Sequence, residues 1–365
     1  MPIEHRSARS LSINAPSDFP KKLGDVLLES PFTLAALSGY SDLGMRVVCR
    51  SLGACLTRNE VVLDRFVLDC RKGARSGRWL DESDHPVAAQ LLGNDPETMG
   101  QAAAHMESFG YDVLDVNFGC PVKKVLGRCR GGFLLGEPET AIAMIREVRN
   151  AVSVPVTIKM RLGTDETSDS IDRFWRILEA GVELGIAGVA VHGRTVDQRY
   201  EGRARWDRLR QVKQRFPSLI VFGSGDLFTA ENCLRMLNET GIDGVTIARG
   251  AICNPWIFRD CLALWRGEWA PPPPTLAEQG ALMDRQYELA IRQYGPEKAS
   301  RQMRKFGIKR AVLHPAAEEV RALFVKLSTP VEYRSLREQY FSSDDRVEAI
   351  ADESSAWSCD SADCS

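Results

Sequence analysis

The sequence contains no apolar run long enough to cross a membrane, since none approaches the ~20 consecutive apolar residues that a transmembrane helix requires. Its first 22 residues, MPIEHRSARSLSINAPSDFPKK, also lack the apolar core of a secretory signal. We therefore expect a cytoplasmic protein without a membrane partner.

The ten cysteines include no C-x2-C pair and have no accompanying histidines, although both features are typical of zinc sites. They are scattered along a chain that we expect to stay in a reducing compartment, which favours free thiols over disulfides. The sequence therefore predicts no metal site.

A strong excess of one charge is also missing, because the formal net charge is −2. The charges are unevenly distributed, however. Between residues 301 and 340, nine Lys and Arg residues stand against four Glu residues, whereas the last 22 residues (344–365) are acidic and small. We predict a disordered tail at 344–365 and a basic face on the preceding segment.

Short apolar or β-branched runs alternate with helical stretches along most of the chain. The eight runs span 32–37, 54–62, 86–93, 113–119, 155–161, 188–194, 219–225 and 244–250. Helix-start signals precede three of the intervening stretches, at Asp95-Pro96, Pro138 and Thr229. Eight such units predict an α/β fold, a (β/α)8 TIM barrel. A doubly wound sheet is the alternative, but no G-x-G-x-x-G follows the first run.

The pattern changes near residue 267, where GEWAPPPPTLAEQ forms a proline-rich stretch that favours an extended connector. Beyond it the sequence is helix-forming without strand-like runs. We therefore predict an N-terminal irregular extension (1–30), the barrel (31–266), a connector (267–275), a small helical domain (276–343) and the acidic tail (344–365).

Polar residues collect where the predicted strands end, which is where barrels of this class assemble their active sites. Lys159 is the most informative, because it follows the apolar run PVTI at an inward position where an unpaired ammonium would be costly. A lone Gln at a strand end, such as Gln90, is usually a satisfied loop residue, whereas His192 taken alone is equally a core histidine. The other candidates at these ends are Ser38, Asn117, Cys120, Arg194, Ser224, Gly225, Asp226, Ala248 and Arg249.

The last two strand ends are rich in glycine, in FGSGD (222–226) and ARGA (248–251). Glycines allow backbone amides to approach an anion closely, and Arg249 adds a positive charge. A phosphate site after strands seven and eight recurs in this fold. We therefore predict a phosphate site here, with two ordinary tight turns as the simpler alternative.

Several motifs resemble those of the tRNA-dihydrouridine synthases. The most specific are VNFGCPVKKV (116–125) and VHGRT-x-x-Q-x-Y-x-G (191–202), and LAALSGYSD, VAAQLLG, VTIKMRLG, FGSGD and IARGAICNPWIF accompany them in the same order. The resemblance covers about 31–340. It implies an FMN-dependent oxidoreductase that uses NADPH to reduce the C5–C6 double bond of specific uridines in tRNA.

The resemblance also implies roles for individual residues. Ala36, Leu37 and Ser38 would lie along the flavin ring, and Gln90, Lys159 and His192 would contact its polar edge. Ser224, Gly225, Asp226, Ala248 and Arg249 would hold the FMN phosphate. Cys120 matches the catalytic cysteine, and Asn117 the asparagine near the target base; Arg194 is a further candidate for contact with the substrate. The helical segment resembles the RNA-docking domain of the family.

Reduction of a uracil double bond needs a hydride at one carbon and a proton at the other. A free thiol, with an ordinary pKa of ~8.5, is mostly protonated at pH 7 yet acidic enough to release its proton. No histidine lies near Cys120 in the sequence to activate a nucleophile. We therefore interpret Cys120 as the proton donor.

Two other functions compete with this interpretation. One is an FMN-dependent barrel oxidoreductase that acts on a small pyrimidine-like molecule, which would have no need of a basic helical segment. The other is a flavin-free RNA-binding protein. We expect tRNA as the substrate, with other structured RNA as the alternative. We also expect the protein to be a monomer.

Overall fold

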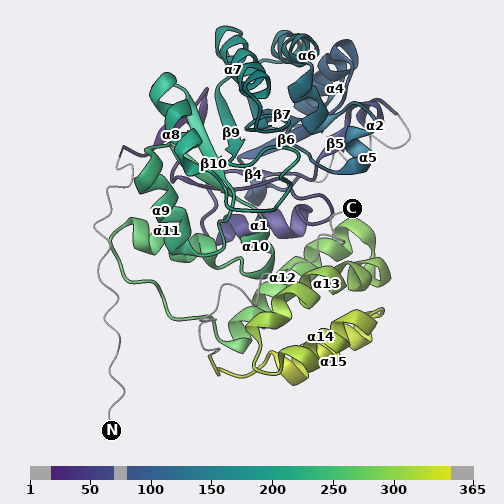
Figure 1. The fold of residues 1–365 in the computed structure, drawn as a ribbon. Helices are drawn as coiled ribbons and strands as arrows, with labels where there is room; N and C mark the ends of the chain where they lie inside the picture. The colour runs from purple at the N-terminus through teal and green to yellow at the C-terminus, as the bar shows by residue number, and fades with distance from the viewer. Residues whose placement is uncertain (1–17, 70–79, 347–365) are drawn as a thin grey trace.

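The computed structural model describes residues 18–69 and 80–346, and it has a barrel with a group of helices packed below it (Figure 1). Most of the predicted N-terminal extension and most of the predicted acidic tail lie outside the described residues. Within the described residues, no helix is long and apolar enough to span a membrane.

Eight parallel strands form the barrel, in the order β3-β4-β6-β7-β8-β9-β10-β11 around the ring. A bridge from Thr33 to Leu56 joins β3 to the segment leading into β4, and β11 pairs with β3, so the ring closes. The bounds are β3 (Phe32–Leu34), β4 (Thr57–Arg58), β6 (Val87–Leu92), β7 (Val113–Phe118), β8 (Val156–Arg161), β9 (Gly188–His192), β10 (Ile220–Ser224) and β11 (Gly244–Ile247). The predicted α/β TIM barrel is confirmed.

One short strand adds to the ring. β5 (Val62–Leu63) pairs with the end of β6, so the single run predicted at 54–62 contains two strands. The other barrel strands are nearly continuous apolar runs in the sequence. This pattern is expected for parallel strands that are covered on both faces.

Helices follow the strands and cover the outside of the barrel. They are α1 (Leu43–Ser51), α2 (Asp64–Leu68), α4 (Pro96–Ser108), α5 (Lys123–Leu126), α6 (Pro138–Ala151), α7 (Ser168–Glu183), α8 (Trp206–Arg215), α9 (Ala230–Thr240), α10 (Arg249–Cys253) and α11 (Ile257–Trp265). Within the described residues, short 3-10 helices lie at Glu82–Asp84, Gly131–Gly136 and Ala311–Leu313.

The three predicted helix starts are confirmed, and their caps show why the helices begin there. Asp95 accepts a hydrogen bond from the Thr98 amide at 2.9 Å, and Pro96 occupies the first helical position of α4. α6 likewise begins at Pro138, and the Thr229 side chain caps α9. Proline is favoured at this position because the first helical amides have no partner within the helix.

Part of the predicted irregular extension is regular. β1 (Lys21–Leu23) and β2 (Val26–Leu28) form an antiparallel hairpin. Leu23 and Leu28 are fully buried in a cluster with residues from several barrel strands, including Ala190 and Phe222. The hairpin thereby closes the amino-terminal end of the barrel with apolar side chains, so any site must lie at the other end. Three-residue strands are too short for a periodic signal, which is why the sequence did not predict them.

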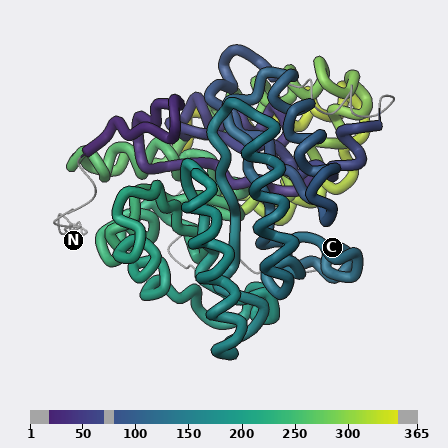
Figure 2. The backbone as a smooth tube through the Cα atoms, turned by 90° about the horizontal axis from the view of Figure 1, so that it is seen from above, coloured from purple at the N-terminus to yellow at the C-terminus, as the bar shows by residue number. Residues whose placement is uncertain are grey.

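Four helices follow the connector: α12 (Leu276–Tyr294), α13 (Pro296–Arg310), α14 (Ala317–Lys326) and α15 (Pro330–Tyr340). α12 packs against α1 so closely that a methyl group on Gly44 would lie 3.0 Å from the Gln286 carbonyl oxygen. Figure 2 shows these yellow-green helices beside the purple, N-terminal part of the barrel, far away in sequence. The division of the chain into separate domains stays a prediction.

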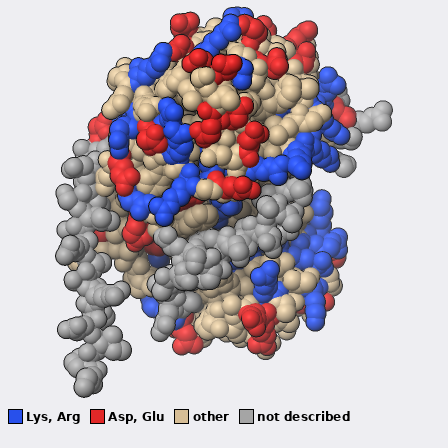
Figure 3. All heavy atoms as spheres, viewed as in Figure 1, with Lys and Arg blue, Asp and Glu red and all other residues tan. Residues whose placement is uncertain are grey.

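The basic face on these helices has fewer free cations than the sequence suggests. Figure 3 shows Lys and Arg side chains over the C-terminal helices at the right of the view. Among the nine cations, Arg310 is buried, and Arg337 pairs with Asp284 at 3.0 Å. The exposed ones are Arg301, Arg321, Lys326 and Arg334.

Candidate active site

The candidate residues lie on neighbouring strands at the carboxyl end of the barrel. Gln90 is on β6, Asn117 on β7, Lys159 on β8 and His192 on β9. Asn117 is the register partner of Lys159, so the two lie on adjacent strands at the same level. Ser224, at the end of β10, is the register partner of His192. Parallel strands therefore bring together residues that are more than a hundred positions apart in the sequence.

Asn117 holds the backbone that carries Cys120. Its side-chain oxygen accepts hydrogen bonds from the amide of Gly119 at 2.9 Å and from the amide of Cys120 at 3.0 Å. Its side-chain nitrogen donates to the Gln90 oxygen at 2.7 Å. A side-chain oxygen that accepts from the amides two and three residues further on is a common local turn for asparagine. The thiol is consequently presented by a fixed turn, and Cys120 is half-buried.

The segment after Cys120 packs back on this turn. It forms the short helix α5, and the Gly132 amide donates to the Cys120 carbonyl oxygen at 3.0 Å. A methyl group on Gly131 would lie 2.9 Å from the Cys120 Cβ, and the φ of Gly131 is +59°. Glycine is favoured there because a side chain would crowd the Cys120 Cβ and because other residues rarely adopt this backbone conformation.

Lys159 is held beside the cysteine turn in a strongly positive environment. Its Nζ would lie 3.5 Å from a methyl group on Gly119. Burial lowers the pKa of Lys159 to about 8, and the nearby Arg161 contributes to this shift. The guanidinium of Arg161 donates to the Gly119 carbonyl oxygen at 3.0 Å, so it supports the same turn from below.

His192 is buried in the same environment and is uncharged at neutral pH. Burial lowers the pKa of His192 well below its ordinary value, and Arg161 and Lys159 add to this effect. The buried Nδ1 atom has no hydrogen-bond partner among the described residues. A buried polar atom without a partner is costly, so this ring is suited to contact a ligand.

The glycine-rich turn after β10 has an unusual backbone. Gly225 has a φ of +117°, and the next residue, Asp226, has a φ of +59°. A methyl group on Gly225 would lie 2.7 Å from the Ala204 Cβ, 3.6 Å from the His192 Nε2 and 3.7 Å from the Arg194 Nη1. Only glycine can bring the chain this near to the two side chains.

Arg194 points into this turn, and most of its hydrogen-bonding capacity is used there. Its Nη2 lies 2.7 and 2.9 Å from the two Asp226 carboxylate oxygens and 2.6 Å from the Gly202 carbonyl oxygen. The side chain is almost fully buried, but its Nη1 has no hydrogen-bond partner in the part of the chain that the structure describes. The structure therefore places Arg194 as a buried support of the turn, with one free nitrogen directed at Gly225.

The second glycine-rich end begins α10. Arg249, its first residue, stacks on the rings of Tyr200 at 4.4 Å and of Phe228 at 5.2 Å. Tyr200 also lies 5.6 Å from the guanidinium of Arg161. Two cations on one ring concentrate positive charge beside the Ser224–Asp226 turn, an arrangement that favours an anion.

The loop that carries Ala36, Leu37 and Ser38 follows β3, and Ser41 holds it in place. The Leu37 amide donates to the Ser41 hydroxyl oxygen at 2.9 Å, and that hydroxyl donates back to the Leu37 carbonyl oxygen at 3.2 Å. Ala36 and Leu37 are half-buried and Ser38 is exposed, so the loop presents a partly apolar surface.

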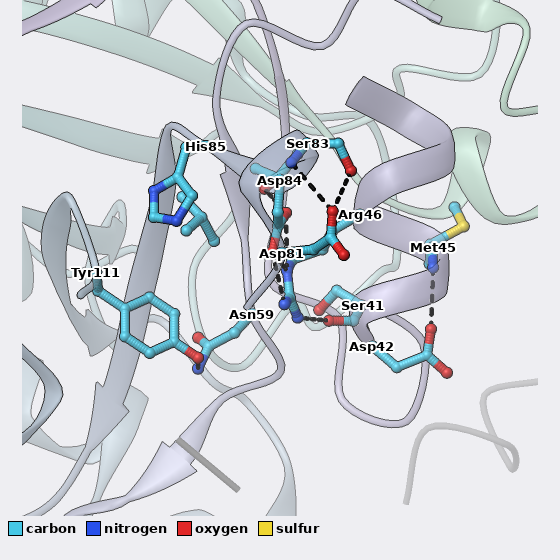
Figure 4. Close-up of polar contacts among 12 residues, drawn as sticks. Ser41, Asp42, Met45, Arg46, Asn59, Asp81, Ser83, Asp84, His85 and Tyr111 are labelled. Carbon is cyan, nitrogen blue, oxygen red and sulfur yellow. Dashed lines mark hydrogen bonds and ion pairs between the residues drawn. The ribbon is translucent and has the colours of Figure 1, made fainter. Parts of the chain in front are cut away.

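A buried ion pair supports this loop from behind, as Figure 4 shows. Arg46 on α1 lies 2.7 Å from Asp84, and it donates to the Ser41 carbonyl oxygen at 3.0 Å. Asp84 also accepts from the Thr57 hydroxyl at 3.0 Å. The pair thus joins the loop after β3, strand β4 and the segment before β6.

Two buried charges lie beneath the site that were not among the residues predicted from the sequence, Arg58 on β4 and Asp115 on β7. Both side chains are almost completely buried, with Arg58 Nε 3.5 Å from Asp115 Oδ2. A signal was present in each case, because a charged residue interrupts an otherwise apolar run that is predicted to face a core. Two such interruptions of opposite charge, in strands on either side of β6, indicate a buried pair.

The described residues contain no group of three or more His, Cys, Asp or Glu side chains that could hold a metal ion. The site instead offers one thiol, several cations and two amide side chains. This set can bind an anion, stabilise developing negative charge and deliver one proton.

Residues 33–345 match the dihydrouridine synthase (Dus) family. The chain is 34% identical over 323 residues to tRNA-dihydrouridine synthase B of Pseudomonas aeruginosa, which covers 88% of this chain and 95% of that protein. It is 33% identical over 295 residues to a probable tRNA-dihydrouridine synthase of Mycobacterium tuberculosis, which covers 78% of this chain and 75% of that protein.

A solved structure with a similar fold is 6-hydroxypseudooxynicotine amine oxidase of Pseudomonas geniculata N1. Its TM-score is 0.54 at 11% sequence identity, over 73% of this chain and 52% of that chain. At this identity the likeness concerns the fold alone.

Proposed function

The chain belongs to the dihydrouridine synthase family, and on that premise we propose that it reduces the C5–C6 double bond of specific uridines in tRNA, with bound FMN and with NADPH as reductant. Members of this family are flavin-dependent oxidoreductases. The observation that carries the proposal is the fixed Cys120 turn beside Lys159 and His192 at the open end of the barrel. The small-molecule oxidoreductase and the flavin-free RNA-binding protein are not favoured by this family membership.

The residues present fit FMN. The free Arg194 Nη1 and the tight glycine at 225 suit an oxygen-rich anion, and the unpartnered His192 Nδ1 suits a polar ring edge. Because the Asp226 carboxylate is paired with Arg194, its backbone rather than its charge would face the phosphate. In the proposed arrangement, Ala36, Leu37 and Ser38 line the ring, Gln90, Lys159 and His192 contact its edge, and Ser224, Gly225, Asp226, Ala248 and Arg249 hold the phosphate.

FMN, when bound and reduced, supplies the hydride for one carbon of the uracil double bond. Cys120 then supplies the proton to the other carbon. The two hydrogen bonds from the Gly119 and Cys120 amides to Asn117 hold the backbone from which the thiol extends, which favours a defined position of the proton donor. The Asn117 side chain, which is partly used in holding this turn, remains the proposed neighbour of the target base.

Lys159 and His192 contribute in different ways. With a pKa of about 8, Lys159 is mostly cationic at pH 7 and can stabilise negative charge that develops on a uracil oxygen. His192, whose pKa is lowered well below its ordinary value, is neutral and acts only through hydrogen bonds. Arg194 supports the proposed phosphate turn, and its contact with the substrate stays a prediction.

The target uridine must leave its stack to reach the site, which costs a few kcal/mol. Phosphate contacts from the exposed cations Arg301, Arg321, Lys326 and Arg334 can offset this cost and make binding sensitive to salt. Folded RNA is recognised largely by shape, which suits a helical platform beside the barrel. Because tRNA is the proposed substrate, the cytoplasm is the proposed compartment.

The experiment that tests this proposal combines two measurements on the purified full-length protein. The protein should be yellow, with the visible absorption of a flavin, and NADPH should bleach it. Incubation with NADPH and unmodified tRNA should then add two hydrogens to individual uridines, as read by mass spectrometry of nuclease fragments. A protein that stays colourless after incubation with FMN, or a flavoprotein that leaves every tRNA mass unchanged, would contradict the proposal.

A further inference from the structure

A line of hydrogen-bonded side chains connects the interior of the barrel to the backbone of Cys120. Arg58 lies beside Asp115, and both side chains are buried, at 1% and 0% exposed. The Gln90 Nε2 donates to Asp115 Oδ2 at 2.7 Å, and the Asn117 Nδ2 donates to Gln90 Oε1 at 2.7 Å. The Asn117 Oδ1 in turn accepts from the Cys120 amide at 3.0 Å.

This line has a single direction, which its two ends require, the Asp115 carboxylate and the Cys120 amide. An ionised carboxylate only accepts hydrogen bonds, so Gln90 must turn its NH2 group toward Asp115. The Gln90 oxygen then faces Asn117, which must donate a hydrogen bond from its own NH2 group. Only in that orientation does the Asn117 oxygen face the Cys120 amide. A reversed amide at either position would place two donors or two acceptors against each other.

We propose that Asp115, held in place by Arg58, is a positioning residue that sets the amide orientations of Gln90 and Asn117 and so fixes the turn that presents the Cys120 thiol. Its catalytic importance rests on the proposed function, because it acts through the proton donor. The positioning itself needs neither flavin nor RNA.

Arg58 has a defined part in this arrangement. Its Nη1 donates to the Thr33 hydroxyl oxygen at 3.1 Å, and its guanidinium lies 5.5 Å from the Phe222 ring, so it cannot turn away from Asp115 without losing both contacts. The cation compensates the buried carboxylate, which would be costly to keep charged without a partner.

A purely structural ion pair would behave differently, and a double substitution separates the two roles. Replacing a buried pair with apolar residues of similar size is often neutral or stabilising. Arg58→Met combined with Asp115→Leu should therefore leave a folded protein. It removes the acceptor for Gln90 without leaving a buried charge, so only the Gly119 and Cys120 amides then hold the direction of the two side-chain amides.

The experiment follows the Cys120 turn directly in the full-length protein as purified. Hydrogen exchange resolved by mass spectrometry reports the Cys120 amide, and peptide mapping after iodoacetamide treatment separates Cys120 from the exposed Cys129. In the double variant we expect Cys120 amide exchange to accelerate about tenfold, the effect of losing one backbone hydrogen bond. The alkylation rate of Cys120, and its pH profile, should change with it, and tRNA reduction should fall while thermal stability is retained.

Two single substitutions serve as matched variants. Asp115→Asn keeps an acceptor for Gln90, because its NH2 group can face the Thr157 hydroxyl, and it should preserve slow exchange at Cys120. Thr157→Val removes the bond to the other Asp115 oxygen, now 2.6 Å long, but leaves the line to Cys120 intact. It should lower stability without altering exchange or alkylation at Cys120.

The proposal is overturned if the folded double variant protects the Cys120 amide as the wild-type protein does, or if Thr157→Val releases that amide equally. If the double variant does not fold, Gln90→Met is the replacement, because it interrupts the line of hydrogen bonds at its centre. Unchanged exchange of the Cys120 amide in Gln90→Met would then overturn the proposal. A protein that shows the predicted exchange pattern but never reduces RNA would leave the positioning intact and refute the proposed function instead.

Discussion

Lys159→Met should make the flavin-free protein more stable at pH 7. The pKa of Lys159 falls from 10.5 to about 8, mainly because the ammonium is buried. At about 1.4 kcal/mol for each tenfold change in proton affinity, this fall corresponds to about 3 kcal/mol of destabilisation while the lysine is charged. Methionine has a similar length and carries no charge, so it should recover this free energy of unfolding.

The pH dependence of the effect has a definite sign. An unfolded lysine keeps its proton up to pH 10.5, whereas folded Lys159 gives it up near pH 8. Between these values the unfolded state binds more protons, so the stability of the wild-type protein rises with pH. Below pH 8 both states are protonated and the full destabilisation is present. The advantage of the variant should therefore be largest at pH 7 and should shrink between pH 8 and pH 10.5.

Urea unfolding of flavin-free protein, followed by tryptophan fluorescence at pH 7, 8.5 and 10.5, measures this difference. Lys21→Met is the matched control, because Lys21 contacts Asp243 at 2.7 Å and its pKa is raised. That ion pair contributes stability below pH 10.5, so the control variant should be less stable than wild type at pH 7. The reasoning is refuted if Lys159→Met is destabilised at pH 7, or if its advantage stays the same at all three pH values.

Three other substitutions address the cysteine, the anion site and the buried support. Cys120→Ala should still allow NADPH to bleach the flavin but should abolish tRNA reduction, whereas Cys129→Ala, the exposed control, should keep both; full turnover by Cys120→Ala would remove the thiol from its role. Arg249→Ala should lose FMN on purification, measured as flavin absorbance per protein, while Arg235→Ala, which removes a comparable arginine stacked on Trp206 at 4.8 Å, should retain it; equal flavin content in the two variants would contradict the phosphate assignment. Asp84→Ala leaves the buried Arg46 without its carboxylate partner and should lower the free energy of unfolding by about 3–5 kcal/mol, measured by urea unfolding. A loss below about 1 kcal/mol would show that the ion pair is unimportant for stability.

The order of the strands and the position of Cys120 could be predicted from the sequence because both depend on local patterns. Apolar runs of six or so residues, helix caps such as Asp95, and glycines at strand ends are readable wherever they occur. Parallel strands then bring their carboxyl ends to one side without further information. The hairpin of β1 and β2 was missed since its strands are too short to carry such a pattern.

The state of individual charges could not be predicted in the same way. Arg194 looked free in the sequence, but it pairs with Asp226 in the turn after the next strand, and this pairing depends on the backbone at Gly225. The sequence has nine Lys and Arg residues between 301 and 340, but it does not show which of them face solvent. Arg310, for example, is buried. Burial and pairing depend on which surfaces meet, and those surfaces come from distant parts of the chain.

The sequence by itself determined the barrel, the strand end on which the cysteine lies and the polar residues that surround it, because strand and turn preferences act over a few neighbouring residues. Only the tertiary structure decided which of those residues are charged, which are already paired and which way the amides of Gln90 and Asn117 face. The physical reason is that proton affinity and hydrogen-bond direction depend on burial and on partners such as Arg58 and Asp115, which the closing of the barrel brings together.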